Sequence, residues 1–250
     1  MSETKQEAKQ EAKQELTRET APEAGRSPLP ATLMVLTFTT GLVDAVSFIG
    51  LGHVFTANMT GNIVFIAFAL AGVSDLSAPR SLVSLGAFMI GAAVAGRLMR
   101  AMKGKTRGRW LTIAAAIEVA LLLAAAACGV GYDYLQESPS SALYGLIVLT
   151  ALAMGLRNAT VLRLKEPDMK TTVLTLTITG IAADSSLAGG PNTRLARRAL
   201  SVLALFLGAA VGAVLLRTMG AAVPLVVMAA LVAGSTALYV RHPASNTPVA

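Results

Sequence analysis

Charged side chains inside long apolar runs are the residues of this sequence best suited to chemistry. Asp44 lies about fourteen residues into one run, Glu118 about nine residues into another, and Arg157 near the end of a third. An ionised carboxylate at membrane depth is costly unless it is paired, hydrated or protonated. We therefore expect Asp44 to line an aqueous pathway as an ion- or proton-coupling group. A buried hydrogen bond to a threonine or to Arg157 is the alternative.

The other intramembrane polar groups fit either packing or transport. Arg157 either extends to the membrane surface or turns inward, where it would pair with Asp44 or meet an anionic substrate. Glu118 is expected to pair with Arg97, which lies near the end of the preceding apolar run. Asn158, next to Arg157, can hydrogen-bond but cannot change its charge.

The first of two short apolar segments, 57–73, opens with a cluster of polar residues and a glycine. These are Asn58, Thr60, Gly61 and Asn62. At membrane depth such a cluster must be satisfied by protein or water, so it predicts a broken-helix site for a small solute or ion. The alternative is a surface loop in which Asn58 caps the following helix.

The second short segment, 171–188, is rich in threonine. The residues that could line a pathway are Thr171, Thr172, Thr175, Thr177, Thr179 and Asp184. In an extended chain the alternate threonines would form a ladder of hydroxyls. In a helix the hydroxyls would scatter and bond to the helix's own carbonyls. Asp184 either faces the pathway or marks the end of the segment.

The sequence lacks the motifs of common enzyme and metal sites. It has two histidines and one cysteine, and Cys128 lies in the middle of an apolar run. There is no H-E-x-x-H, G-x-S-x-G, P-loop or G-x-G-x-x-G pattern. We therefore expect no enzyme activity, no cofactor and no metal site.

Composition places the chain in the membrane. Of its 250 residues 54% are hydrophobic and only 14% are charged, and its mean hydropathy is +0.63. A soluble domain carries about 25% charged residues, so a soluble enzyme and a disordered chain are both excluded. The net charge of +7 comes from basic residues in short loops between apolar runs. This pattern is typical of membrane orientation and phospholipid contact rather than of nucleic-acid binding.

Six apolar runs are long enough to cross a bilayer. They are residues 30–52, 81–99, 110–131, 141–162, 199–217 and 220–240. With the two short segments they predict an all-α polytopic membrane helix bundle of six full spans plus two re-entrant or broken segments. A seven-span alternative remains, because residues 62–73 are fully apolar.

Loop charges decide between the topologies. Loop 100–109 has five Lys or Arg residues, loops 163–170 and 189–198 have three each, and loop 132–140 has none. Cytoplasmic loops carry the excess of basic residues. Six spans place every strongly basic loop and both termini in the cytoplasm, whereas eight spans would invert the rule at loop 100–109.

The two halves of the membrane region resemble each other. Gly41-Leu42-Val43-Asp44-Ala45 recurs as Gly155-Leu156-Arg157-Asn158-Ala159, and each motif opens a group of three long spans. An odd number of spans per half makes the halves inverted relative to each other. Interrupted segments at matching positions of such halves are a pointer to a transport site, with chance similarity between small-residue helices as the alternative. The expected site brings Asn58–Asn62 and Thr171–Thr179 together at one cavity, with Asp44 on its wall.

Two sequence blocks also resemble a known family. GLVDAVSFIGLGHVFTANMTGN, followed later by GLRNA and TTVLTLTITGIAADS, is similar to the YoaK family of bacterial inner-membrane proteins. The resemblance covers roughly residues 30–240. It implies a bacterial multi-pass membrane protein, but the family is a domain of unknown function and supplies no substrate.

These observations predict three regions. Residues 1–28 form a charged tail whose K-Q-E-A repeat stacks like charges, so it should be disordered or a frayed helix. Residues 29–242 form the membrane domain, with halves 29–135 and 138–242, and residues 243–250 form a flexible tail. The predicted function is transport of a small solute or ion, with a non-transporting scaffold or partner subunit as the alternative. The expected partners are the lipid bilayer and the solute, a homo-oligomer is left open, and no nucleic acid is expected.

Overall fold

The long apolar runs of the sequence form helices. The computed structural model describes residues 28–164, 174–189 and 195–248. Within these ranges eight α-helices follow one another, with two short 3₁₀ helices, η1 (Ser186–Ala188) and η2 (Pro243–Asn246). The α-helices are α2 (Leu29–Gly50), α3 (Met59–Leu70), α4 (Ala78–Ala101), α5 (Arg107–Cys128), α6 (Ser140–Leu164), α7 (Leu174–Ala183), α8 (Leu195–Met219) and α9 (Ala222–Val240).

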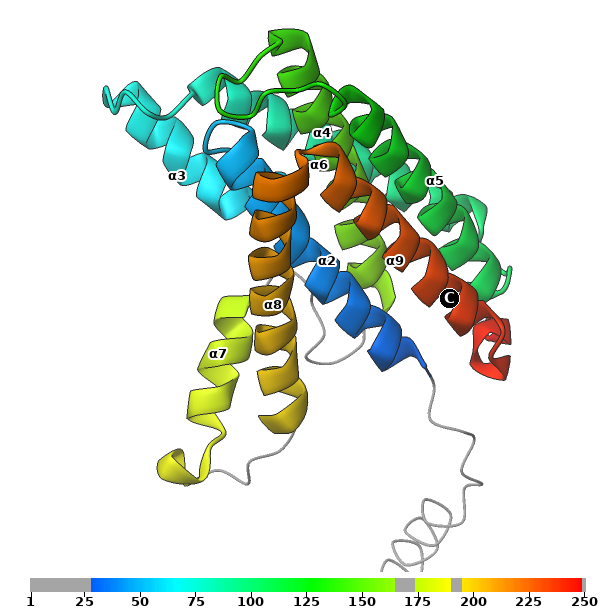
Figure 1. Ribbon diagram of the computed structural model, residues 1–250. Helices are drawn as coiled ribbons and strands as arrows, with labels where there is room; N and C mark the ends of the chain where they lie inside the picture. The colour runs from blue at the N-terminus through cyan, green and yellow to red at the C-terminus, as the bar shows by residue number, and fades with distance from the viewer. Residues whose placement is uncertain (1–27, 165–173, 190–194, 249–250) are drawn as a thin grey trace, which may run out of the picture.

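Six of these helices are long and apolar enough to cross a membrane, and two are not. The long helices α2, α4, α5, α6, α8 and α9 run between two opposite ends of the bundle (Figure 1). Helix α3 has 12 residues and α7 has 10, so at about 1.5 Å per residue each is far shorter than a bilayer core of about 30 Å. The predicted six-span helix bundle is confirmed, and α3 is too short for a seventh span.

The two short helices lie at opposite ends of the bundle. Helix α3 projects at the end where α2 finishes, whereas α7 lies at the end where α2 begins and where the C-terminal helix α9 finishes (Figure 1). Helix α3 packs against α4, and α7 packs against α8. We refer below to the end with the start of α2 and the finish of α9 as the terminal end, and to the other as the far end.

Glycines set the two closest helix crossings. At the crossing of α2 and α8, a methyl group on Gly41 would overlap the carbonyl oxygen of Leu205. At the crossing of α4 and α6, a methyl group on Gly155 would overlap the carbonyl oxygen of Phe88. Small residues allow this close approach of helix backbones in a membrane.

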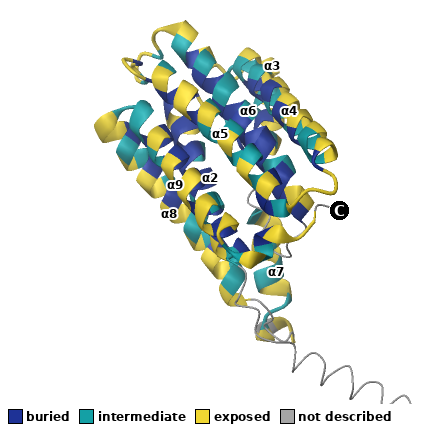
Figure 2. Ribbon diagram, turned by 90° about the vertical axis from the view of Figure 1, so that its right-hand side faces the viewer, coloured by how far each residue is buried: buried dark blue, intermediate teal, exposed yellow. Residues whose placement is uncertain are grey.

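The remaining helices complete a bundle around α2 and α6, whose surfaces are the most buried of the six spans (Figure 2). Helix α5 packs against α6 and α9, and α9 also packs against α2. Side chains that face outward from α3, α4 and α8 are largely exposed and apolar, among them Phe68, Met89 and Phe206. That exposure suits contact with lipid.

The C-terminal residues differ from the predicted flexible tail. Helix η2 packs against α5 and α9, Ser245 is buried beside Gly108, and the Arg107 amide donates to the Thr247 carbonyl over 2.7 Å. These backbone contacts hold residues 243–248 against the turn between α4 and α5. The predicted N-terminal tail, residues 1–28, lies outside the described residues except for Pro28.

The loop at the far end also packs onto the bundle. The Tyr132 hydroxyl donates to the Gly50 carbonyl over 2.8 Å, and Arg80 pairs with Glu137 over 2.5 Å. Burial raises the pKa of Tyr132 to about 12. The phenol therefore stays protonated at neutral pH and keeps its donor.

Candidate functional site

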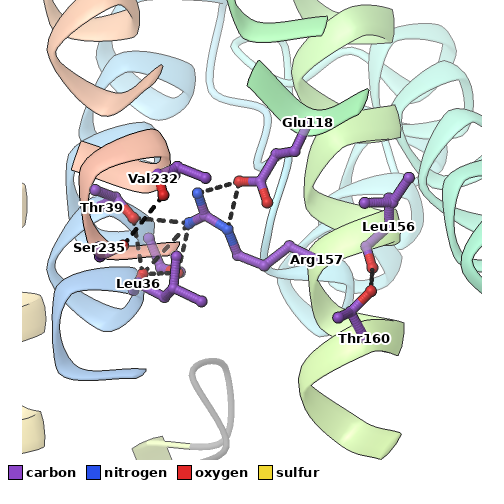
Figure 3. Close-up of polar contacts among 9 residues, drawn as sticks. Leu36, Thr39, Glu118, Leu156, Arg157, Thr160, Val232 and Ser235 are labelled. Carbon is purple, nitrogen blue, oxygen red and sulfur yellow. Dashed lines mark hydrogen bonds and ion pairs between the residues drawn. The ribbon is translucent and has the colours of Figure 1, made fainter. Parts of the chain in front are cut away.

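A buried ion pair lies at the centre of the helix bundle. The Arg157 side chain of α6 is 1% exposed and Glu118 of α5 is 5% exposed. Arginine Nε donates to Glu118 Oε1 over 2.7 Å, and a terminal guanidinium nitrogen donates to the same oxygen (Figure 3). Two opposite charges thus satisfy each other where neither could remain unpaired at acceptable cost.

The other side of the guanidinium is held by α2. Its second terminal nitrogen donates to Thr39 Oγ1 over 2.9 Å, to the Leu36 carbonyl over 3.3 Å and to Thr40 Oγ1 over 3.5 Å (Figure 3). Thr39 and Thr40 in turn donate to the Leu36 carbonyl. Arg157 therefore joins α2, α5 and α6, and the inward alternative for Arg157 is confirmed.

The expected partner of Glu118 was wrong. Glu118 pairs with Arg157, whereas Arg97 lies exposed on α4, outside the pair. The cause is the helix arrangement, because α4 crosses α6 at Gly91 and Gly155 and has little contact with α5. The α5 face that carries Glu118 is thereby turned toward α6.

A small cavity extends from the ion pair toward the terminal end. Its volume is about 30 Å³, room for about one water molecule. The walls come from the first turns of α2 and α5 and from the last turns of α6 and α9. They are formed by Leu29, Thr32, Leu33, Leu36, Leu111, Ala114, Ala115, Glu118, Leu156, Arg157, Thr160, Val161, Leu164, Val232, Thr236 and Tyr239. The lining therefore combines mostly aliphatic side chains with one ion pair at its inner end.

Toward the far end the same helices pack around buried apolar side chains. Val43 of α2, Leu122 of α5, Leu146 of α6 and Met228 of α9 are all fully buried in one hydrophobic cluster. The ion pair therefore separates a packed apolar layer from a pocket.

The polar cluster of α3 serves packing. Asn62 is fully buried; its Oδ1 accepts from the Phe55 amide over 2.9 Å, and its Nδ2 donates to the Phe55 carbonyl over 2.6 Å and to Ser84 Oγ over 3.3 Å. Asn58 is exposed and caps α3 by accepting from the Gly61 amide, which confirms the capping alternative. Thr60 is exposed and Gly61 half-buried, and none of the four lines the cavity.

The threonines of α7 are helical. Thr179 donates to the Thr175 carbonyl over 2.9 Å, so the helical alternative is confirmed over the extended ladder. Thr177 is half-buried. Asp184 pairs with Arg198 of α8 over 2.5 Å, which places it at the contact of α7 with α8. Thr171 and Thr172 lie outside the described residues.

The expected meeting of the two short segments was wrong for their described parts. Helix α3 and helix α7 make no contact with each other in the described ranges. Each is held by its own long neighbour, α4 or α8, at opposite ends of the bundle (Figure 1). The buried charged side chains instead come together at Glu118 and Arg157.

Asp44 is half-buried on α2 and does not line the cavity of the ion pair. Its Oδ1 is buried, with no hydrogen-bond partner in the part of the chain that the structure describes. The alternative of a pair with Arg157 is wrong, because the guanidinium binds Glu118 and the threonines instead. Asn158 is half-buried on α6.

Thr39 and Thr40 were not foreseen as part of the site. Both are fully buried hydroxyls on α2 that accept from Arg157. No group of three His, Cys, Asp or Glu side chains lies close enough to hold a metal ion within the described ranges.

The long apolar helices and the enclosed ion pair define a multi-pass α-helical membrane protein. The chain belongs to the family described as protein of unknown function (DUF1275), whose model matches residues 32–238. It is 32% identical over 154 residues to the UPF0700 transmembrane protein YoaK of Bacillus subtilis (strain 168). That alignment covers 62% of this chain and 66% of the relative, slightly less than two thirds of its length. No solved structure matches.

Proposed function

We propose that this chain is a carrier for a small solute, with its binding site at Glu118 and Arg157. The observation that carries the proposal is the buried ion pair at the inner end of a cavity inside a six-helix membrane bundle. Ionisable groups inside transmembrane segments are rare and mark substrate or ion pathways. This site replaces the one expected from the two short segments.

The packing of the helices supports an inverted repeat. Pairing each helix of α2–α5 with the helix four places later turns every contact between described α-helices into another such contact or into itself. Thus α2 with α8 corresponds to α6 with α4, α2 with α9 to α6 with α5, and α3 with α4 to α7 with α8. Repeats of this kind are common in secondary transporters.

The backbone contacts of two glycines also correspond between the two halves. Gly41 lies against the Leu205 carbonyl and the Ala209 amide. Gly155, at the matching position of the other half, lies against the Phe88 carbonyl and the Ala92 amide. Leu205 and Ala209 have the same spacing as Phe88 and Ala92, so one backbone contact is made twice. This recurrence supports duplication over chance similarity.

The closed far end favours a carrier over a channel. A channel needs a continuous path, whereas the apolar cluster around Val43, Leu146 and Met228 fills the space beyond the ion pair. A carrier instead opens its site to one side at a time by moving one repeat against the other. The present arrangement is then the state with access from the terminal end.

The family resemblance supports a location in the bacterial inner membrane. We place the terminal end in the cytoplasm, because loop 100–109, with five Lys or Arg residues, lies at that end and cytoplasmic loops are basic. Both termini are then cytoplasmic.

One observation favours the alternative of a non-transporting partner subunit. The polar groups of Asn58 and Asn62 are satisfied within the chain, as packing devices would be. The two functions differ in whether water reaches the ion pair.

Cysteine accessibility tests the proposal. Thr160 lines the cavity, and Thr150 is a buried threonine of the same helix that does not; each donates to the carbonyl four residues earlier. In a Cys128→Ala background we expect a small water-soluble thiol reagent to modify Thr160→Cys in membranes and to leave Thr150→Cys unmodified. Equal protection of both cysteines would contradict a solute site. Equal modification of both would contradict a closed far end.

A further inference from the structure

The two charged groups of the cavity differ in the charge states open to them. The guanidinium of Arg157 stays protonated in proteins, so its positive charge is permanent. The Glu118 carboxylate can take up a proton and become neutral. The pair can therefore change its net charge in one direction only, from zero to plus one.

The geometry leaves room for that proton. Both bonds from Arg157 end on Oε1 of Glu118, and the second carboxylate oxygen, Oε2, receives neither of them (Figure 3). Glu118 itself lines the cavity. A proton arriving through the cavity can thus bind Oε2 while the contact through Oε1 persists.

No other ionised group of the cavity lining competes for this role. Among the residues that line it, α6 presents Arg157 to Glu118 and α9 presents the phenol of Tyr239 and the hydroxyl of Thr236. Helix α2 adds the hydroxyl of Thr32. Helix α4 contributes no residue to this lining.

The walls define the rest of the ligand. Most of the lining side chains are aliphatic, including Leu33, Leu36, Leu111, Leu156, Val161 and Val232. Such walls bind an apolar body and give no hydrogen bonds to a strongly hydrated ion. The present volume of about 30 Å³ also requires the walls to part when a ligand enters.

We propose that the ligand of this cavity is a small organic monoanion with an apolar body, bound by Arg157 and accompanied by one proton that neutralises Glu118. Ligand, proton and ion pair then sum to zero charge, as the empty site does. A cation would instead require Arg157 to lose its proton. The proposal rests on the proposed function in taking the cavity for a solute site.

Three probes of one chain length test the ligand class. Butyrate, butylamine and butanol share an apolar body and differ in charge. With the full chain purified in detergent, we expect calorimetry to detect butyrate binding and weaker or no binding of the other two. Preferred binding of butylamine or butanol would overturn the proposal.

Proton counting tests the role of Glu118. In weakly buffered solution with a pH indicator, butyrate binding should take up close to one proton per anion. Linkage then weakens butyrate binding by up to about tenfold for each pH unit of increase. Binding without proton uptake and without pH dependence would overturn the coupling.

Variants separate the two groups. Arg157→Gln should abolish butyrate binding, whereas Glu118→Gln should retain it and lose both proton uptake and pH dependence. Arg97→Gln, a change at an arginine outside the cavity, should leave binding and proton uptake unaltered. If Glu118→Gln fails to fold, proton uptake by the unmodified protein still decides.

The outcomes also separate this inference from the proposed function. Butyrate binding with proton uptake, but no solute movement by the protein in liposomes, would contradict transport and leave the ligand class standing. Suppose instead that the thiol reagent modifies Thr160→Cys and that the protein moves a cationic or neutral solute into liposomes without binding the anion. That result would overturn the ligand class and leave transport standing.

Discussion

The two ends of the central helices are built differently, although they come from matching sequence. Arg157 of α6 occupies the position that Val43 of α2 occupies in the other motif. Arg157 carries the ion pair beside a cavity, whereas Val43 is fully buried in the apolar cluster of the far end. One substitution between matching positions thus accompanies the change from packed core to polar site.

This difference shows how a near-symmetric framework can hold one asymmetric site. The glycine contacts at Gly41 and Gly155 are the same in both crossings, so the backbone arrangement does not distinguish the ends. The side chains do. In the carrier that we propose, the crossings provide the two alternative arrangements and the ion pair provides the ligand chemistry.

The largest expected effect comes from breaking the ion pair. Glu118→Ala leaves Arg157 buried without a counter-ion, and we expect a loss of about 3–5 kcal/mol of stability. The double change Glu118→Leu with Arg157→Met removes both charges and should restore most of that loss. Thermal unfolding in mild detergent measures both.

A double variant as unstable as Glu118→Ala would mean that the pair is required for the fold. The difference between the ion pair and the apolar far end would then reflect folding and not ligand binding.

Cavity creation should distinguish the two ends. Leu146→Ala removes a fully buried side chain from the far-end cluster, and we expect a cost of about 2–5 kcal/mol. Leu111→Ala truncates a cavity wall at the terminal end, where fewer contacts are lost, so its cost should be smaller. The same unfolding measurement compares them, and equal costs would contradict a looser terminal end.

The crossing glycines give an intermediate effect. Gly91→Ala places a methyl group against the Leu152 carbonyl, and overpacking of this kind costs about 1–3 kcal/mol. Gly96 lies on the same helix with open space around its missing side chain, so Gly96→Ala should be neutral or slightly stabilising. A harmless Gly91→Ala, by unfolding temperature, would mean that α4 and α6 can separate without cost.

The helix bundle could be predicted from the sequence, because it follows from local properties. Span length and apolar content are each read within one segment. The six spans, the two short helices and the cap at Asn58 are examples.

The partner of Glu118 could not be predicted in the same way, because it depends on which helices touch. Arg97 is closer in the chain, but the glycine crossings place α4 on α6 and turn Glu118 toward Arg157. The depth of each residue in the membrane could have indicated the pair, since α5 begins and α6 ends at the terminal end. Counted from that end, both residues lie two to three turns inside their helices.

The smallest effects should come from the short helices, and their order sharpens the comparison between them. Asn62 holds α3 through buried hydrogen bonds to Phe55 and Ser84. Its replacement by alanine leaves the Phe55 amide without an acceptor, at a cost of about 1–3 kcal/mol, whereas Ser84 still donates to the Phe55 carbonyl. Asp184 holds α7 through a pair whose carboxylate is 46% exposed, and an exposed pair contributes about 0–1 kcal/mol. Asp184→Asn should therefore change the unfolding temperature least, and added salt should shrink the change further. A larger effect of Asp184→Asn than of Asn62→Ala would contradict this order and would make α7, rather than α3, the more firmly anchored of the two short helices.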